Sequence, residues 1–160
     1  MSKIAASLAL ASKGCQAMDT SDDYIEAIGL LTKAIELNPS DFRYYANRSL
    51  AFYRLNRYEM AAQDALKAVR LNPRCPANYV RLAAALNGRR RYRDAEVAAL
   101  RALALEPTLR IAAYELLMAR KMALISVGFD KHDVLQVIAN CNTIDDGFGR
   151  LLKLIQMKDI

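Results

Sequence analysis

The sequence predicts an all-α fold in which helix pairs stack into a solenoid. Three prolines, Pro39, Pro73 and Pro107, follow one another at equal intervals, and each closes a similar phrase. The phrases are Ala-Ile-Glu-Leu-Asn-Pro, Ala-Val-Arg-Leu-Asn-Pro and Ala-Leu-Ala-Leu-Glu-Pro. A fixed period of about 34 residues marks a repeat architecture. Glycine is scarce and alanine and leucine dominate, which suits long helices with few breaks.

The first repeat extends from about Ser7 to Pro39. We expect its two helices over Lys3–Met18 and Asp22–Leu37, because the segment 19–23 between them is rich in the Asp, Ser and Thr residues that cap helices. Gly14 and Ala27 lie thirteen residues apart, which predicts a turn one residue longer than in the other repeats.

The second repeat covers Phe42–Cys75 and the third covers Pro76–Leu109. Each contains two apolar-periodic segments separated by a short turn, and Pro76 occupies a position where the first turn of a helix tolerates proline. The expected helices are Phe42–Leu55, Arg57–Leu71, Pro76–Asn87 and Tyr92–Leu105.

A seventh helix, Arg110–Val127, is predicted to close the stack, since terminal units of a solenoid need a solvated cap. Two further amphipathic segments, Asp130–Asn140 and Thr143–Met157, follow it. We therefore divide the chain into a repeat domain with its capping helix, 1–127, and a helical C-terminal extension, 128–160. The extension is apolar enough to pack on the stack, to bind a partner or to self-associate.

The charge of the chain is concentrated in its middle. The net charge is +6, but between Arg43 and Arg110 fourteen basic residues, thirteen of them Arg, stand against five acidic ones. An acidic partner is the first expectation.

Several classes of function are disfavoured by what the sequence lacks. It has three cysteines, an odd and widely spaced set that indicates neither a disulfide framework nor a zinc site, so we expect a reducing compartment, the cytoplasm or the nucleus. No apolar run approaches the roughly 18–20 residues of a membrane span. No phosphate loop, nucleophile elbow or metal motif is present, so we expect no enzyme activity, no cofactor and no metal.

The repeats resemble the tetratricopeptide repeat family, whose members share this period. The similarity covers Ser7 to Leu109 and rests on small residues in the second helices and on tyrosines at fixed positions. These residues are Ala27, Ala61, Ala95, Ala34, Ala68, Ala102, Tyr45, Tyr79, Tyr58 and Tyr92. The stretch 44–52 is similar to the second repeat of co-chaperone domains of this family.

The resemblance implies a superhelix whose first helices line a concave face that binds peptides. In co-chaperone relatives, five polar positions on that face clamp the C-terminal carboxylate of a heat-shock protein. Here Asn47 and Arg81 match two of them, whereas Ala11, Cys15 and Ala77 replace the other three. A standard chaperone-tail clamp is therefore not expected, and an adaptor with a relaxed clamp stays an alternative.

We predict a groove with an apolar floor and arginines at its walls, suited to an acidic or amphipathic peptide. Its residues are Arg43, Asn47, Leu50, Arg54, Arg81, Ala84, Tyr114 and Met118. The predicted function is that of a protein–protein interaction scaffold or adaptor.

A second basic feature lies in the turns inside the repeats. These arginines predict a ridge along one edge of the solenoid: Arg57, Arg89, Arg90, Arg91 and Arg93. RNA binding through this edge is a further alternative, although a solvated surface is the simpler interpretation of such charge runs.

Overall fold

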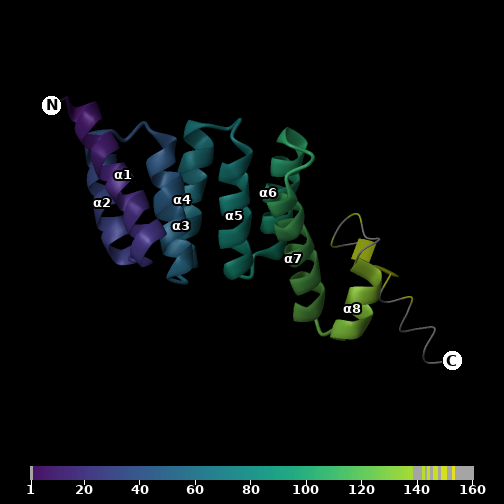
Figure 1. Ribbon diagram of the computed structural model, residues 1–160. Coiled ribbons are helices and arrows are strands. Elements are labelled where there is room, and N and C mark those ends of the chain that lie inside the picture. Colours follow the sequence, from purple (N-terminus) through teal and green to yellow (C-terminus); the bar gives the residue numbers. More distant parts are fainter. Residues whose placement is uncertain are drawn as a thin grey trace.

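The computed structural model describes residues 2–138 and, beyond them, residues 142, 144, 146, 147, 149, 150 and 153. This part of the chain is a row of helices without strands, stacked side by side (Figure 1). The helices are α1 (Lys3–Ser21), α2 (Tyr24–Leu37), α3 (Phe42–Arg54), α4 (Tyr58–Leu71), α5 (Pro76–Gly88), α6 (Tyr92–Leu105), α7 (Arg110–Ser126) and α8 (Lys131–Ile138). The all-α solenoid prediction is confirmed. The expected helix Thr143–Met157 lies mostly outside the described residues.

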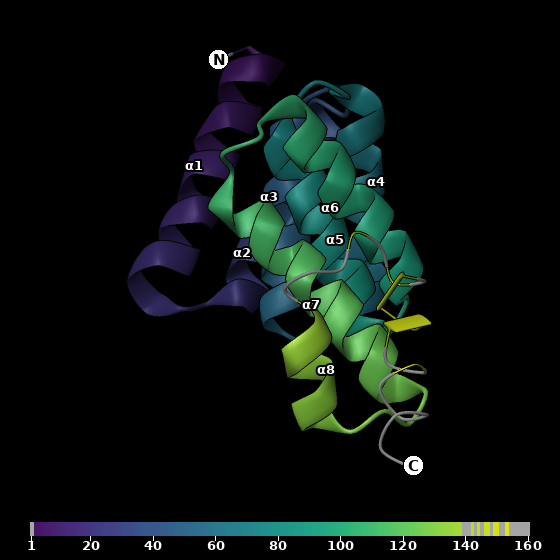
Figure 2. The same ribbon diagram turned by 90° about the vertical axis from the view of Figure 1, so that its right-hand side faces the viewer.

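The helices form two layers that run the length of the stack. Each pair, α1 with α2, α3 with α4 and α5 with α6, packs closely, and α7 covers the last pair. Each first helix also contacts the first helix of the next unit, from α1 to α3, α3 to α5 and α5 to α7. Within the described part, the second helices α2, α4 and α6 do not contact one another to that extent. Figure 2 shows the resulting twist along the stack. None of these helices is long and apolar enough to cross a bilayer.

Small residues let the helices approach closely. The repeat alanines are fully buried, with exposed fractions of 0%: Ala27, Ala34, Ala61, Ala68, Ala95 and Ala102. Larger side chains fill the spaces between the pairs, among them Leu31 and Tyr44 in the first half of the stack. The core therefore continues from one unit to the next, as a solenoid requires.

The turn inside each repeat contains one left-handed residue. Asp22, Asn56 and Arg90 have φ angles of 51°, 58° and 60° and are themselves one repeat period apart. A backbone hydrogen bond that spans five residues closes this turn in the second and third repeats. The Arg57 N–H donates to the Phe52 carbonyl, and the Arg91 N–H donates to the Leu86 carbonyl.

In the first repeat the equivalent bond, from Asp23 to the Ala17 carbonyl, spans six residues. Gly14 and Ser49 hold equivalent places in the two repeats. A Cβ atom added at Gly14 would lie 3.3 Å from the Ala27 carbonyl oxygen, and the Ser49 hydroxyl donates a hydrogen bond of 2.8 Å to the Ala61 carbonyl. These equivalences confirm the extra residue. Its location differs from our expectation, because α1 continues to Ser21 and only residues 22 and 23 form the turn.

The C-terminal end of the described stack is tied together by polar and apolar contacts. Arg120 of α7 donates to the buried carboxylate of Glu96 on α6 at 2.9 Å and also to the backbone carbonyl of Asn142. The other oxygen of Glu96 accepts from the backbone N–H of Ile144. Leu124 packs against Val134 and Ile138 of α8, so α8 folds back on the capping helix.

Candidate functional site

One repeat position of the first helices places three polar side chains in a column. Asn47 of α3, Arg81 of α5 and Glu115 of α7 follow one another at intervals of one repeat period. Since these three helices contact each other in sequence, the column runs along the first-helix layer of the stack. The same face thus presents an amide, a cation and a carboxylate.

A cavity of about 300 Å³ opens beside this column between α3, α5 and α7. It is lined by Ser49, Leu50, Tyr53, Arg54, Val80, Arg81, Ala84, Ile111 and Glu115. The predicted groove residues Leu50, Arg54, Arg81 and Ala84 are therefore brought together. Apolar side chains provide most of the lining and three charged groups stand among them, an arrangement typical of ligand pockets.

Arg81 is held in place through one nitrogen. Its Nε donates to the backbone carbonyl of Ala46 at 2.9 Å, and within the described part of the chain no hydrogen bond or ion pair reaches its terminal amino groups. Burial lowers the pKa of the Arg81 guanidinium, partly offset by the Cys75 and Cys15 thiols. A half-buried guanidinium without a carboxylate is costly to keep charged, and the hydrogen bonds of an anion would offset that cost.

Glu115 is the acidic member of the column, and the sequence interpretation did not single it out. Its carboxylate accepts from Asn87 Nδ2 at 2.9 Å, and burial raises the pKa of this carboxyl against the opposing effect of that bond. The signal was present in the sequence, because Glu115 stands one period after Arg81.

A second cavity, of about 220 Å³, adjoins the first through Tyr53 and Glu115, which line both. The predicted residues Tyr114 and Met118 line it, together with Asn87, Gly88, Tyr92 and Met122. The two cavities thus lie next to each other along the first helices, and we refer to them together as the track.

Asn47 lies further along the column toward α1. Its Nδ2 donates to the Cys15 Sγ at 3.1 Å, and burial raises the pKa of the Cys15 thiol. Asn47 is thus engaged with a neighbouring helix, and neither cavity includes it.

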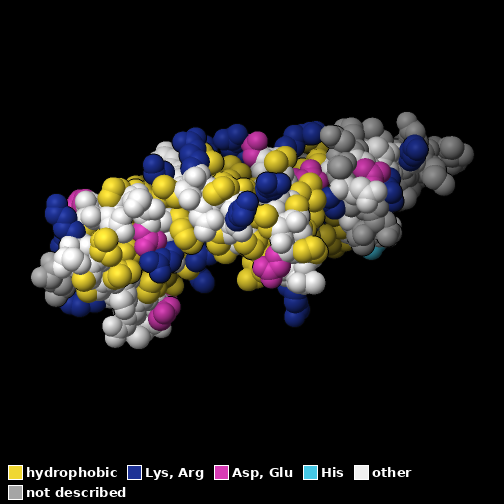
Figure 3. Space-filling model, turned by 90° about the horizontal axis from the view of Figure 1, so that it is seen from above, with side chains coloured by type: hydrophobic (Ala, Val, Ile, Leu, Met, Phe, Trp, Pro, Cys, Tyr) yellow, Lys and Arg dark blue, Asp and Glu magenta, His cyan; other side chains and the backbone are white. Residues whose placement is uncertain are grey.

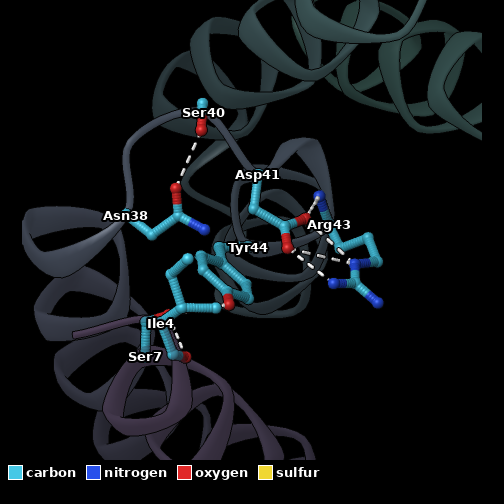
Figure 4. Close-up of polar contacts among 7 residues, drawn as sticks. All are labelled: Ile4, Ser7, Asn38, Ser40, Asp41, Arg43 and Tyr44. Carbon is cyan, nitrogen blue, oxygen red and sulfur yellow. Dashed lines mark hydrogen bonds and ion pairs between the residues drawn. The ribbon is translucent and has the colours of Figure 1, made fainter. Parts of the chain in front are cut away.

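Arg43 does not join the other predicted groove residues. It lies at the start of α3, where its guanidinium forms a bidentate ion pair with Asp41, the residue that caps the helix (Figure 4). Its side chain is 58% exposed. The expectation that Arg43, Arg54 and Arg81 converge fails for Arg43, because the preceding Asp41 draws its side chain back to the helix end. Figure 4 also shows Tyr44 of α3, whose hydroxyl shares a hydrogen bond with the hydroxyl of Ser7 on α1.

The basic edge is partly neutralised. Arg89 pairs with Glu59, and Arg91 pairs with Asp94 at 2.7 Å. Arg57 and Arg90 are exposed, and Arg93 has an interaction partner of its own. Basic side chains are also visible on the opposite end of the helices, which carries the connections between repeats (Figure 3).

Comparison with solved structures identifies the family. The Arabidopsis OM64 TPR domain is 31% identical, superposes with a TM-score of 0.71, and is matched over 98% of its length and 74% of this chain. The chain belongs to the tetratricopeptide repeat family. The family model described as "Tetratricopeptide repeat" matches residues 42–75, the second repeat.

Two further relatives extend the comparison of this tetratricopeptide protein. The first TPR of Spaghetti (RPAP3), solved bound to the HSP90 peptide SRMEEVD, is 30% identical with a TM-score of 0.71, over 78% of this chain and 96% of that domain. Human serine/threonine-protein phosphatase 5 is 51% identical over 45 residues, which are 28% of this chain and 9% of the phosphatase. From the sequence we also predict a narrower similarity, to the tetratricopeptide repeat protein thirty-one of animals, which these relatives do not test.

The five clamp positions of co-chaperone relatives take different roles in this tetratricopeptide domain. Ala11 is buried between helices, Ala77 is exposed, and Cys15 accepts the Asn47 hydrogen bond. Among these five positions, Arg81 is the one charged residue, and in the described structure the donors of its terminal amino groups are free. Within the described residues no cluster of three or more His, Cys, Asp or Glu side chains could hold a metal ion.

Proposed function

We propose that this chain is a protein-interaction adaptor that binds an acidic or amphipathic peptide along the track formed by the two adjoining cavities. The observation that carries the proposal is Arg81, a half-buried cation with free terminal donors beside an apolar cavity. A carboxylate of the ligand supplies the missing acceptor with two parallel hydrogen bonds. Leu50, Val80 and Ile111 receive the apolar side chains that follow it.

The relatives support a peptide ligand of this kind. The Spaghetti domain binds a peptide that carries two glutamates and a terminal aspartate, and it shares 30% of its residues with this chain. Arg54 adds a second positive charge to the lining of the same cavity. Charge complementarity therefore favours acidic peptides over neutral ones.

Two substitutions that copy the preceding repeat test this proposal. Arg81→Asn introduces the residue found one period earlier, at Asn47, and Arg90→Asn introduces the residue of the equivalent turn, Asn56. Both remove one positive charge, but only the first lies in the cavity. The probes are fluorescent heptapeptides that alternate Asp or Glu with Leu, Val or Phe, with matched Asn or Gln versions.

We expect the tightest acidic peptide to lose at least about tenfold in affinity in Arg81→Asn, since a charge-assisted hydrogen bond contributes about 1.5–3 kcal/mol. The Arg90→Asn variant keeps the wild-type affinity. Fluorescence anisotropy at fixed salt measures both. If amide and acidic peptides bind equally well, or if Arg90→Asn is the variant that loses affinity, the groove proposal is wrong.

A chaperone-tail adaptor is the second candidate, favoured by the similarity to the peptide-bound Spaghetti domain. Because Ala11, Cys15 and Ala77 leave three clamp positions without cationic or amide side chains, we expect peptides ending in Glu-Glu-Val-Asp to bind weakly or not at all. Isothermal titration calorimetry with a free and an amidated C-terminus decides the matter. Low-micromolar binding that requires the free carboxylate promotes this candidate over the first.

RNA binding through the basic edge is a third candidate, and the ion pairs of Arg89 and Arg91 weigh against it. Nucleic-acid affinity falls steeply with salt concentration. A single-stranded RNA probe that fails to bind even at low salt rules the edge out as an RNA site.

A further inference from the structure

The outer face of the stack carries a groove that the first-helix site does not use. It lies between the second helices α4 and α6, with α5 as its floor, and has a volume of about 580 Å³. Its lining residues are Leu66, Val69, Tyr79, Leu82, Leu86, Asp94, Val97, Ala98, Leu100, Arg101 and Ala104. Apart from Asp94 and Arg101, all of them are apolar or aromatic.

The corresponding groove one repeat earlier, between α2 and α4, is polar and smaller, about 310 Å³. Arg48 crosses it from the floor helix α3. Its guanidinium donates to both carboxylate oxygens of Asp64, at 2.7 and 2.9 Å, and to the Thr32 hydroxyl at 2.9 Å. This network narrows the earlier groove and lines it with polar side chains that already bond one another.

One period later, each member of that network is replaced by an apolar residue. Thr32, Arg48 and Asp64 become Leu66, Leu82 and Ala98, and Gln63 becomes Val97. The replacement removes the side chains that filled the groove and leaves an apolar surface. Three specific exchanges therefore accompany the larger and more apolar α4–α6 groove, whereas the helices themselves are stacked in the same way.

The apolar surface is exposed to solvent. Val97 is 68% exposed, Leu66 40% and Leu100 41%. A contiguous patch of this kind on a soluble domain marks an interaction site more often than a scattered single residue does. The helices α4 and α6 each have 14 residues, which corresponds to walls about 21 Å long at 1.5 Å per residue.

The charges around the groove indicate the chemistry of its occupant. Asp94 is neutralised by Arg91. Arg101, on the wall, forms no ion pair within the described part of the chain, and neither does Arg70, which stands four residues after Leu66 on α4. Two cations without carboxylate partners thus flank an apolar channel, so an acidic occupant is complementary.

We infer that the α4–α6 groove docks an amphipathic helix of a partner protein, with apolar side chains at i, i+3/i+4 and i+7 on Leu66, Leu82 and Val97 and with carboxylates toward Arg70 and Arg101. A helix suits the groove because two helices form the walls and a third forms the floor, which is the usual setting for helix-in-groove recognition. This site is independent of the peptide track on the first helices.

The test uses a designed helix as the probe and a groove-filling variant as the control. The probe is a fluorescent Ala-rich peptide, five helical turns long, with Leu at one helical face and Glu at the flanks of that face. A matched probe carries Lys in place of Glu. The variant combines Leu66→Thr, Leu82→Arg and Ala98→Asp, which transfers the Thr32–Arg48–Asp64 network into the groove.

We expect the acidic helix to bind the wild-type protein, the basic helix to bind at least tenfold more weakly, and the triple variant to lose the acidic helix. Amide chemical shifts should change in α4 and α6 and stay constant around Arg81. The single variant Val97→Gln, which copies Gln63 at an exposed position, weakens binding without disturbing the core and serves if the triple variant does not fold.

Three outcomes overturn the inference. The first is equal affinity for the acidic and basic helices, and the second is binding that the Val97→Gln and triple variants both retain. The third is concentration-dependent dimerisation, seen by analytical ultracentrifugation, that Val97→Gln abolishes, because it assigns the groove to a second copy of this chain.

Discussion

Two sets of positions in this solenoid repeat with the same period but differ in what they tolerate. The second-helix alanines, such as Ala61 and Ala95, are the same residue in each unit and are fully buried. The first-helix column changes completely, from Asn47 to Arg81 to Glu115, and its last two members line a cavity. Close helix approach thus fixes one set through packing, while the other is free to vary in charge, which suits the recognition role that we propose for it.

The largest expected effect separates the two sets by the same chemical change. Ala61→Leu should destabilise the domain by about 1–3 kcal/mol, because overpacking a closely packed helix interface forces backbone shifts. Ala84→Leu, which adds the same atoms next to the 300 Å³ cavity, should leave the unfolding midpoint close to wild type. Urea denaturation of both variants measures the contrast, and equal losses would contradict it.

A second prediction concerns the polar network of the α2–α4 groove. Arg48→Leu leaves the Asp64 carboxylate, whose side chain is only 10% exposed, without its guanidinium partner, which should cost about 1–2 kcal/mol. Adding Asp64→Ala recovers most of that loss, since the pair then matches Leu82 and Ala98 of the next repeat.

Chemical denaturation of the single and double variants checks this. A double variant as unstable as the single one means that the ion pair itself stabilises the fold. The triple variant that adds Thr32→Leu should also acquire binding of the acidic helix probe, because it recreates the apolar groove one repeat earlier.

The smallest expected effect depends on pH. Burial raises the pKa of the Glu115 carboxyl, so the folded state binds its proton more tightly than the unfolded state does. The favourable contribution is present below the ordinary carboxyl pKa and is lost as the pH rises through the raised one. Glu115→Gln should therefore melt above wild type at pH 7 and together with it at pH 4, as measured by circular dichroism.

Much of the fold could be predicted from the sequence, because proline and alanine at a fixed period report helix ends and close contacts directly. The boundary of α1 could not be, since Asp, Thr and Ser at positions 19–21 favour caps locally and yet remain helical when Thr20 bonds back to the Gln16 carbonyl.

For the candidate site, periodicity gave the correct helices and the neighbours Leu50, Arg54, Arg81 and Ala84. Periodicity failed for Arg43, because it gives the position of a residue on the helix but not the partner of its side chain. The Arg43 guanidinium bonds the nearby Asp41 carboxylate. The outer groove could be recognised only once the structure showed the Thr32–Arg48–Asp64 network, because the groove lies where the next repeat lacks those three residues.

The Arg120–Glu96 pair has a consequence for how the molecule comes apart. A solenoid loses structure from its ends, since each unit contacts only its neighbours. One end is fastened by a side chain that joins α6, α7 and the segment near Asn142, whereas α1 leaves Ile4 and Leu8 exposed on its outer surface. Fraying should thus be directional: under mild denaturant the amides of α1 exchange their hydrogens before those of α7, and the stack unzips from its N-terminal unit.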